Sequence, residues 1–232
     1  MTAAAPELTV VMPVYNERAT VERAVESVLD ADLGDTFELL VVDDGSIDGT
    51  RELLRNRSWP DPVRVLQHDR NRGKGAAIRT ALGEARGRYT AIMDADLEYD
   101  PRDMHLLLEP LRNGDARAVF GTRAFQSHSA FSFWYVVGNR AVTLVANLVY
   151  NSWISDLMTG QKAMETELFR SLRLRERGFA VEAEITARLL GAGVRIYEVP
   201  IGYRARSRDE GKKLTGLDGV RVLWTLLRCR IS

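Results

Sequence analysis

The sequence predicts an α/β fold in which helices flank a mainly parallel β-sheet. Short runs rich in β-branched residues alternate with segments whose apolar residues recur at helical spacing. This alternation favours strand–helix–strand units. Acidic and polar residues follow directly on several of the runs. Since ligands of open α/β sheets bind beyond the carboxyl ends of the strands, these residues form the first candidate site.

Five strands and four helices account for the first half of the chain. Each expected strand is short, apolar and bounded by turn residues. The strands are expected at Leu8–Val14, Phe37–Val42, Val63–Gln67, Tyr89–Met93 and Ala116–Phe120. The helices are expected at Glu17–Leu29, Gly49–Asn56, Lys74–Ala85 and Asp103–Arg112.

The second half begins with a long apolar and aromatic stretch, Phe131–Ile154. The other expected elements are a short strand at Lys162–Met164, a helix at Glu182–Leu190, a strand at Val194–Val199 and a helix at Gly216–Leu227. No internal repeat or linker is evident. We therefore expect one domain over residues 1–232, with a nucleotide-type half at residues 1–120 and an appended half at residues 121–232.

Charge and cysteine content argue against several classes of protein. Lysine plus arginine and aspartate plus glutamate each number 32, which disfavours nucleic-acid binding through bulk charge. A single cysteine, Cys229, rules out an intrachain disulfide and fits a reducing compartment. The sequence has no uninterrupted apolar run of about 20 residues and no signal-peptide pattern at its start. We expect a soluble, cytosolic protein.

The pair Asp94 and Asp96 is the most informative feature. Both carboxylates follow an apolar run, and the alternation of an extended backbone directs them to the same side. Two hard oxygen donors suit a divalent cation such as Mg²⁺ or Mn²⁺, which keeps positions open for phosphate oxygens. A solvated acidic turn is the alternative for such a pair in isolation.

Three further residues indicate nucleotide binding. Asp43 and Asp44 end the second expected strand, where they are placed to accept hydrogen bonds from a base or a ribose. Lys74 stands between two glycines at a helix start, where free N–H groups and the helix dipole favour phosphate. A simple helix cap is the alternative for Lys74.

Arginines supply candidates for a second phosphate site. Arg123 follows the fifth expected strand, and Arg140 interrupts an apolar stretch, where an unpaired charge is costly. Guanidinium groups bind phosphate in a bidentate manner. A solvated charged surface is the alternative for both arginines and for the basic loop 204–213.

Together these motifs resemble those of family-2 glycosyltransferases, above all the branch that contains dolichol- and polyprenyl-phosphate sugar synthases. The resemblance covers nearly the whole chain. Its motifs are Val11-Met-Pro-Val-Tyr-Asn-Glu17, Asp43-Asp-Gly-Ser-Ile-Asp-Gly-Thr50, Asn71-Arg-Gly-Lys-Gly75, Met93-Asp-Ala-Asp-Leu-Glu98, Gly121-Thr-Arg123, Asp156-Leu-Met-Thr-Gly-Gln-Lys162, Glu182-Ala-Glu184, Tyr197-Glu-Val-Pro200 and Glu210-Gly-Lys-Lys213. The resemblance implies a GT-A fold with a Rossmann-like sheet, a GDP- or UDP-hexose donor, a divalent metal (Mn²⁺ or Mg²⁺) and inversion at the anomeric carbon.

The resemblance also implies roles for individual residues. The residues matching nucleoside-binding positions are Pro13, Tyr15, Glu17 and Asp44. Asp94 and Asp96 match metal and pyrophosphate ligands. Glu98 falls where the mannosyl-phosphate members usually carry glutamine as a further metal contact. The residues assigned to the acceptor phosphate are Arg123, Arg140, Arg206 and Lys213.

The leading hypothesis is a metal-dependent inverting glycosyltransferase that moves mannose or another hexose to a polyprenyl phosphate. A phosphate monoester, with a second pKa of about 6, is mostly ionised at neutral pH and needs orientation more than a base. A soluble hydroxyl acceptor is the alternative, and it needs a general base, for which Asp156 is the candidate unless it is only a turn residue. A nucleotide-sugar-binding protein without turnover is the third hypothesis. The residues expected to act in catalysis are Asp96, Asp156, Arg123 and Arg140.

Two segments indicate a lipid surface. Phe131–Ile154 and Gly216–Ser232 combine aromatic and apolar residues with arginines, as do helices that lie at a bilayer interface. A helix packed in the core is the alternative. We expect a protein that is held peripherally at the cytoplasmic face of the membrane, by these segments or by a membrane-anchoring partner protein.

Overall fold

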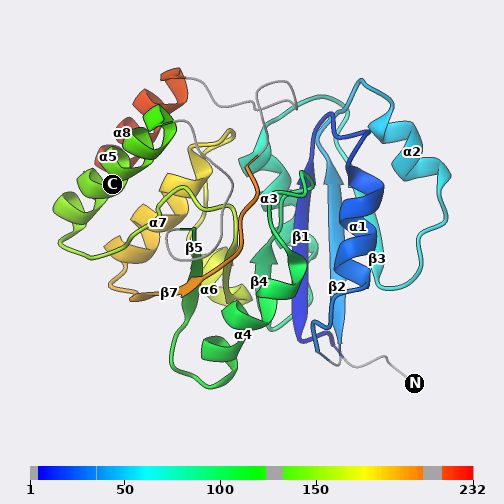
Figure 1. The fold of residues 1–232 in the computed structure, drawn as a ribbon, viewed down its shortest axis with the longest axis horizontal. Coiled ribbons are helices and arrows are strands. Elements are labelled where there is room, and N and C mark those ends of the chain that lie inside the picture. Colours follow the sequence, from blue (N-terminus) through cyan, green and yellow to red (C-terminus); the bar gives the residue numbers. More distant parts are fainter. Residues whose placement is uncertain (1–4, 35, 124–132, 206–215, 232) are drawn as a thin grey trace.

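The computed structural model describes residues 5–34, 36–123, 133–205 and 216–231. Its centre is one seven-stranded sheet in the order β3-β2-β1-β4-β6-β5-β7, with helices on both faces (Figure 1). The strands are β1 (Leu8–Val14), β2 (Phe37–Asp43), β3 (Val63–Gln67), β4 (Tyr89–Ile92), β5 (Ala118–Thr122), β6 (Lys162–Glu165) and β7 (Ile196–Pro200). The helices are α1 (Val21–Leu29), α2 (Thr50–Asn56), α3 (Lys74–Glu84), α4 (Met104–Arg112), α5 (Phe133–Tyr150), α6 (Thr166–Ser171), α7 (Val181–Gly191) and α8 (Gly216–Ile231), with a 3₁₀ turn, η1 (Pro101–Asp103), before α4.

The sheet is mainly parallel, as the sequence predicts. Strands β1 to β4 pair in parallel, and so do β5 and β7. Among the described strands, only β6 runs antiparallel, and it lies between β4 and β5. A strand from residues 121–232 thus joins strands from residues 1–120 in one continuous sheet.

Alternation along the strands builds a core on each face of the sheet. In β1, Val10 and Met12 pack with α1 and α4, whereas Val11 packs on the opposite face with α3, α6 and α7. Because both faces are covered, most residues of the central strands β1, β2 and β4 are apolar rather than alternating with polar residues. This arrangement leaves the strand ends as the places where polar residues gather.

A third apolar cluster lies outside the sheet, where α7 packs against α5 and α8. One side of α7 faces the sheet through Val181 and Ile185, and the other side packs through Ala183 and Ala187 against the outer helices. Figure 1 shows α5 and α8 side by side beyond α7. Within the described part of the chain, no helix is both long enough and apolar enough to cross a bilayer.

The observed elements differ from the expected ones mainly at their ends. The first helix begins at Val21 rather than Glu17, because the N–H groups of Thr20 and Val21 donate to the Glu17 carbonyl in a preceding turn. β5 and β7 each begin two residues later than expected, at Ala118 and Ile196, where their mutual pairing starts. The short helix α6 was not expected, because six residues are too few to show helical periodicity.

Candidate functional site

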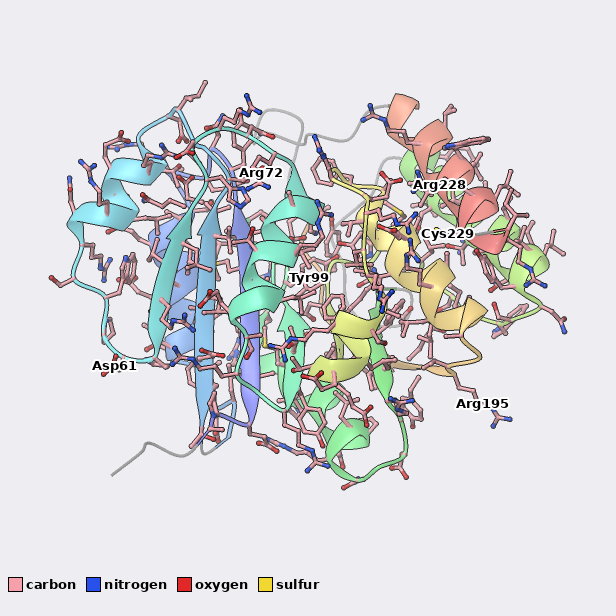
Figure 2. All side chains as sticks on the ribbon, turned by 180° about the vertical axis from the view of Figure 1, so that it is seen from behind. Asp61, Arg72, Tyr99, Arg195, Arg228 and Cys229 are labelled. Atoms are coloured by element: carbon pink, nitrogen blue, oxygen red, sulfur yellow. The ribbon has the colours of Figure 1, made fainter. Side chains whose placement is uncertain are left out.

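The carboxyl ends of β1, β2 and β4 meet at one edge of the sheet, the upper edge in Figure 1. Figure 2 shows Arg72, from the loop before α3, at this edge, and Asp61 at the opposite one. The candidate donor residues lie at this carboxyl edge, as expected for an α/β sheet.

The loops after β1 and β2 are bonded to each other. Asn16, with a φ of 53°, donates from its N–H to Ser46 Oγ, and its side-chain oxygen accepts from the Ile47 N–H. The N–H of Glu17 donates to Thr50 Oγ1. These contacts hold the loop after β1 in one position. The expected nucleoside-binding residues of this loop and strand end are all half-buried: Pro13, Tyr15 and Glu17.

Asp43 and Asp44 point inward rather than toward solvent. The Asp43 carboxylate is fully buried and pairs with Arg51 at 3.0 Å. Asp44 is 2% exposed, lies 2.6 Å from His68 Nδ1, and accepts from the Gly73 N–H at 2.6 Å. In this conformation both carboxylates shape the loops around the site. Their contact with a nucleoside stays a prediction.

Asp94 and Asp96 follow β4 on a tight turn and are both partly exposed. The N–H of Glu98 donates to Asp96 Oδ1, and Leu97 takes a φ of 61°. Gly160 lies against Asp94, so close that a Cβ at this glycine would stand 2.5 Å from Asp94 Oδ2. The turn and the glycine together hold the acidic pair at the carboxyl edge.

Lys74 is the cation beside Asp94. Its Nζ lies 2.8 Å from Asp94 Oδ1 and 2.8 Å from Glu182 Oε1. Burial opposes its charge, but the two carboxylates raise the pKa of Lys74 above its ordinary value. Burial raises the pKa of Asp94 to about 6, against the attraction of Lys74 and with a further contribution from the negative charge of Asp96. Lys74 thus stays charged at neutral pH.

Arg123 lies at the end of β5 in a second cluster. Its guanidinium makes a bidentate pair with Asp156, at 2.6 and 2.8 Å, and stacks 5.0 Å from the Tyr203 ring centroid. Asn139 also donates to Asp156. Burial opposes ionisation of Asp156, but Arg123 and these hydrogen bonds hold its pKa below the ordinary value. A carboxylate held in this way is a poor general base.

The other expected acceptor residues are not part of this cluster. Arg140 is exposed on α5. The argument that a charge in this stretch must be paired therefore does not apply, because this side of the helix faces solvent. Arg206 and Lys213 lie outside the described residues. Phosphate binding by these three residues stays a prediction.

Glu98 bonds to Tyr203, which belongs to the cluster around Arg123, rather than joining Asp94 and Asp96. Its carboxylate accepts from the Tyr203 hydroxyl at 2.5 Å, and its carbonyl accepts from the Arg204 N–H. Tyr203 in turn packs on Tyr99, with ring centroids 5.1 Å apart. Across the described residues, no three His, Cys, Asp or Glu side chains are arranged to hold a metal ion. The expected three-carboxylate set is therefore not preassembled.

The carboxylates of Asp94 and Asp96 nevertheless suit a divalent cation whose remaining ligands include phosphate oxygens. Mg²⁺ in phosphate-handling sites is commonly bound by one or two carboxylates, with waters and phosphate oxygens completing its coordination. Asp94 and Asp96 offer hard oxygen donors of this kind at a partly exposed strand end. The donor set therefore fits Mg²⁺ or Mn²⁺.

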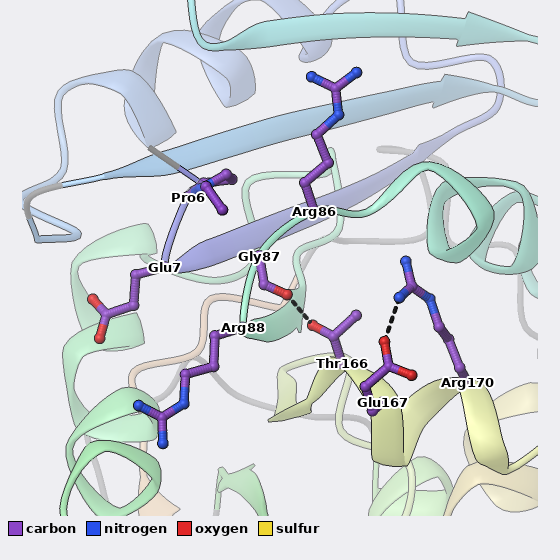
Figure 3. Close-up of a pocket in the computed structure, with 9 residues that line it drawn as sticks. Pro6, Glu7, Arg86, Gly87, Arg88, Thr166, Glu167 and Arg170 are labelled. Carbon is purple, nitrogen blue, oxygen red and sulfur yellow. Dashed lines mark hydrogen bonds and ion pairs between the residues drawn. The ribbon is translucent and has the colours of Figure 1, made fainter. Parts of the chain in front are cut away.

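A hollow at the opposite, amino edge of the sheet belongs to neither cluster (Figure 3). Within it, Thr166 donates to the Gly87 carbonyl, and Glu167 pairs with Arg170. Thr166, Glu167 and Arg170 of its lining therefore already have partners within the hollow.

The comparisons with known proteins decide the family. The model described as "Glycosyl transferase family 2" matches residues 9–173. The chain belongs to glycosyl transferase family 2.

Two similar curated proteins are named for a lipid phosphate. A dolichol-phosphate mannosyltransferase of Pyrococcus furiosus is 29% identical over 228 residues, covering 96% of this chain and 64% of the relative. An undecaprenyl-phosphate mannosyltransferase of Micrococcus luteus is 28% identical over 242 residues, covering 96% and 98%. Glycosyltransferase AglD of Haloferax volcanii is 32% identical over 248 residues, covering 100% of this chain and 39% of the relative. The chain thus spans less than two thirds of the Pyrococcus and Haloferax proteins.

Solved structures share the fold over almost the whole chain. Glucosyl-3-phosphoglycerate synthase from Mycobacterium tuberculosis, in complex with Mn²⁺, UDP and phosphoglyceric acid, has a TM-score of 0.76 and 25% identity, covering 98% of this chain and 79% of that one. The same enzyme with Mg²⁺ and UDP has a TM-score of 0.74, 25% identity, and coverage of 97% and 80%. The expected GT-A fold is thereby confirmed. The comparisons do not support a separate membrane-anchoring partner protein, and that expectation is withdrawn.

Lys162 and Glu182 belong to motifs that the sequence shares with family 2, but the motifs alone indicate no role for them. In the structure Glu182 reaches Lys74, and Lys162 lies behind it with no exposed side-chain surface. Nothing local distinguishes them, because their elements carry other charged residues, Glu165 in β6 and Glu184 and Arg188 in α7. Sequence alone does not show that the two elements place these charges side by side.

Proposed function

We propose that this family-2 protein moves a hexose from a nucleoside-diphosphate donor to a polyprenyl phosphate, with inversion and with a divalent metal. The observation that carries the proposal is the carboxyl edge itself. There, Asp94 and Asp96 offer two oxygen-rich side chains and Lys74 a fixed cation. Anionic and cationic groups side by side suit a metal–diphosphate pair better than either ligand alone.

On the donor side, Asp94 and Asp96 would hold Mn²⁺ or Mg²⁺. A metal bound there would neutralise the negative charge that develops on the departing diphosphate. Lys74 would face the same diphosphate from the first residue of α3. The half-buried residues expected around the nucleoside are Pro13, Tyr15 and Glu17, with Asp43 and Asp44 supporting the loops.

On the acceptor side, Arg123 is the phosphate-binding residue for which the structure offers most support. Asp156 fixes one edge of its guanidinium and Tyr203 lies against its face. Tyr203 contacts Tyr99, whose hydroxyl accepts from the N–H of Gly160, the glycine beside Asp94. Arg123 thus belongs to the same packed group as the metal ligands. Since Asp156 is a poor base, an acceptor that needs none is favoured.

We also propose that α5 and α8 rest peripherally on the cytoplasmic face of a membrane. Their outer faces carry exposed apolar side chains, among them Phe133, Leu148 and Trp224, and the loop after α5 carries Trp153 at 88% exposure. Arg228 and Arg230 lie near the end of α8. Apolar area together with positive charge favours an anionic lipid surface.

A second candidate is transfer to a hydroxyl of a small phosphorylated acceptor. The observation that favours it is the similarity to the M. tuberculosis synthase, which was solved with phosphoglyceric acid. Arg123 suits either acceptor, because both present a phosphate to a guanidinium. The low pKa of Asp156 disfavours this candidate.

The test is a transfer assay with radiolabelled UDP- and GDP-hexoses and Mn²⁺, with and without polyprenyl phosphate. Label that becomes extractable into organic solvent only when the lipid phosphate is present supports the proposal. Water-soluble labelled product with phosphoglycerate supports the second candidate. Metal-dependent nucleotide binding, with neither transfer nor donor hydrolysis, would leave a binding protein without turnover.

A further inference from the structure

Behind Lys74 lies a buried row of charges that the proposed chemistry does not use. Glu182, at the start of α7, places Oε1 at 2.8 Å from Lys74 Nζ and Oε2 at 2.5 Å from Lys162 Nζ. The row therefore runs from Lys162 through Glu182 and Lys74 to Asp94 at the edge. The exposed fractions of the Lys162 and Glu182 side chains are 0% and 3%.

Lys162 is the fixed end of this row. Besides Glu182, its ammonium donates to the carbonyls of Leu157 and Thr159, at 3.2 and 2.5 Å. It also lies 4.8 Å from the Phe120 ring centroid. An ammonium has three N–H donors, so all of them have partners here. Because the Lys162 side chain is fully buried, its ammonium cannot exchange these partners for water.

Its contact with Lys162 fixes the position of the Glu182 carboxylate, and that carboxylate in turn fixes the position of the Lys74 ammonium. A buried carboxylate is strongly destabilised without a partner, and Glu182 has one lysine on each oxygen. Burial opposes its ionisation, but Lys162 and Lys74 keep its pKa below the ordinary value. Lys74 therefore has two anionic contacts of different kinds. Asp94 is partly exposed, whereas Glu182 is buried and fixed.

We propose that Glu182 and Lys162 form a positioning pair that holds Lys74 in place for the donor diphosphate. If Asp94 held a metal, Lys74 would lose part of that contact and would keep its contact with Glu182. The ammonium would then remain at the carboxyl edge rather than extending into solvent. This inference rests on the proposed function for the identity of the anion, but not on turnover.

The discriminating variant is Glu182→Gln, assayed by calorimetric titration of UDP and of GDP in the presence of Mn²⁺. Removing a negative charge near an anion site should tighten anion binding if only bulk charge matters. Loss of positioning should instead weaken anion binding, because Lys74 no longer has its fixed contact with Glu182. We expect the affinity for the diphosphate to fall about ten- to a hundredfold, because Lys74 loses the buried ion-pair contact that fixes it.

The matched control is Glu184→Gln. Glu184 is equally buried on α7, but it pairs with Arg188 and the backbone of Arg175 and Glu176 instead of Lys74. This variant removes the same charge two residues away, so its diphosphate affinity should stay within about twofold of the wild type if positioning is specific.

A second variant covers the case in which Glu182→Gln does not fold. Lys162→Met combined with Glu182→Met replaces the buried pair by apolar side chains at unchanged net charge, a replacement that proteins often tolerate. It should show the same loss of affinity. In a Lys74→Met background, adding Glu182→Gln should cause no further loss, because the two residues act together.

Unchanged or tighter diphosphate binding in folded Glu182→Gln, or in the double methionine variant, would overturn the inference. If binding weakens as expected while the wild type transfers no sugar, the inference stands and the proposed function fails. A wild-type protein that binds neither UDP nor GDP with Mn²⁺ would overturn both.

Discussion

Two regions of the molecule are built in different ways. One is the carboxyl edge around Asp94, here called the donor edge, and the other is the Arg123–Asp156 cluster with α5 and α8, here called the acceptor side. At the donor edge, the loops after β1 and β2 are bonded to each other, and Asp44 ties β2 to the loop before α3. On the acceptor side, the described anchor is one bidentate pair, Arg123 with Asp156, next to helices with exposed apolar faces. Under the proposed function, donor binding would depend on a closed network, and acceptor binding would depend on one ion pair and an exposed apolar surface.

This contrast predicts that substitutions on the two sides affect different steps. Changes at the donor edge should abolish turnover with every acceptor. Changes on the acceptor side should alter the acceptor KM or lipid binding while leaving nucleotide affinity unchanged.

Asp96→Ala should lower metal-dependent transfer by about 10³-fold, because a lost metal contact removes several kcal/mol of transition-state stabilisation. The measurement is the transfer rate over a range of Mn²⁺ concentrations, with thermal unfolding as a check on the fold. Asp115→Ala removes an exposed carboxylate before β5, far from the carboxyl edge, and should leave the rate unchanged. Wild-type activity of Asp96→Ala at saturating Mn²⁺ would refute this role.

Asp156→Asn should destabilise the fold by about 3 kcal/mol at pH 7, because Arg123 loses its buried partner. The folded-state pKa of Asp156 lies below its unfolded value. Its contribution is therefore present above the unfolded pKa of about 3.9 and is lost as the pH falls through the folded pKa.

The measurement for Asp156→Asn is urea unfolding of wild type and variant from pH 7 down to pH 3.5. The difference in unfolding free energy should stay constant down to about pH 5 and shrink below about pH 4. A difference that grows on acidification would contradict the assigned ion pair.

Arg123→Lys should raise the KM for the acceptor phosphate about tenfold, because a single ammonium replaces a bidentate guanidinium. Nucleotide affinity should stay at the wild-type value. The control is Arg117→Lys, which alters an exposed pair with Glu165 at the start of β5. Equal losses in donor and acceptor binding would mean that the two sides are not separable as described.

Trp153→Ser and Trp224→Ser should each weaken binding to anionic vesicles about fivefold, since each removes part of the apolar area available to the bilayer. Transfer to a short, water-soluble phosphate acceptor should not change. Ile47→Ser, which removes an exposed apolar side chain at the donor edge, serves as the control. Unaltered vesicle binding in both tryptophan variants would exclude this face as the lipid contact.

Much of the fold follows from local sequence patterns. All seven strands and the larger helices were expected close to their observed positions, because each has its own apolar pattern and turn residues. The placement of β6 between β4 and β5 was not, since Lys162–Glu165 carries no local signal for its partners or direction. Its place depends on pairing with β4 and β5, which are distant from it in the sequence.

The candidate site was predictable to a similar degree. Strand ends marked Asp94 and Asp96, and the glycines marked Lys74. The inward orientation of Asp44 and the contact of Glu98 with Tyr203 depend on neighbours that are distant in sequence. The burial of Lys162 could not be predicted from its residue type, because lysine side chains are normally exposed and this one is fully buried.

Whether the acceptor is a phosphate on a lipid can be measured by ³¹P NMR of that phosphate. Transfer of a hexose converts a monoester, whose second pKa is about 6, into a diester without an ionisation in that range. With a nucleoside-diphosphate hexose and Mg²⁺, which is diamagnetic, the polyprenyl phosphate signal should become insensitive to pH between 5 and 8 as nucleoside diphosphate is released. A lipid phosphate signal that still titrates near pH 6, while the donor is consumed, would contradict the account.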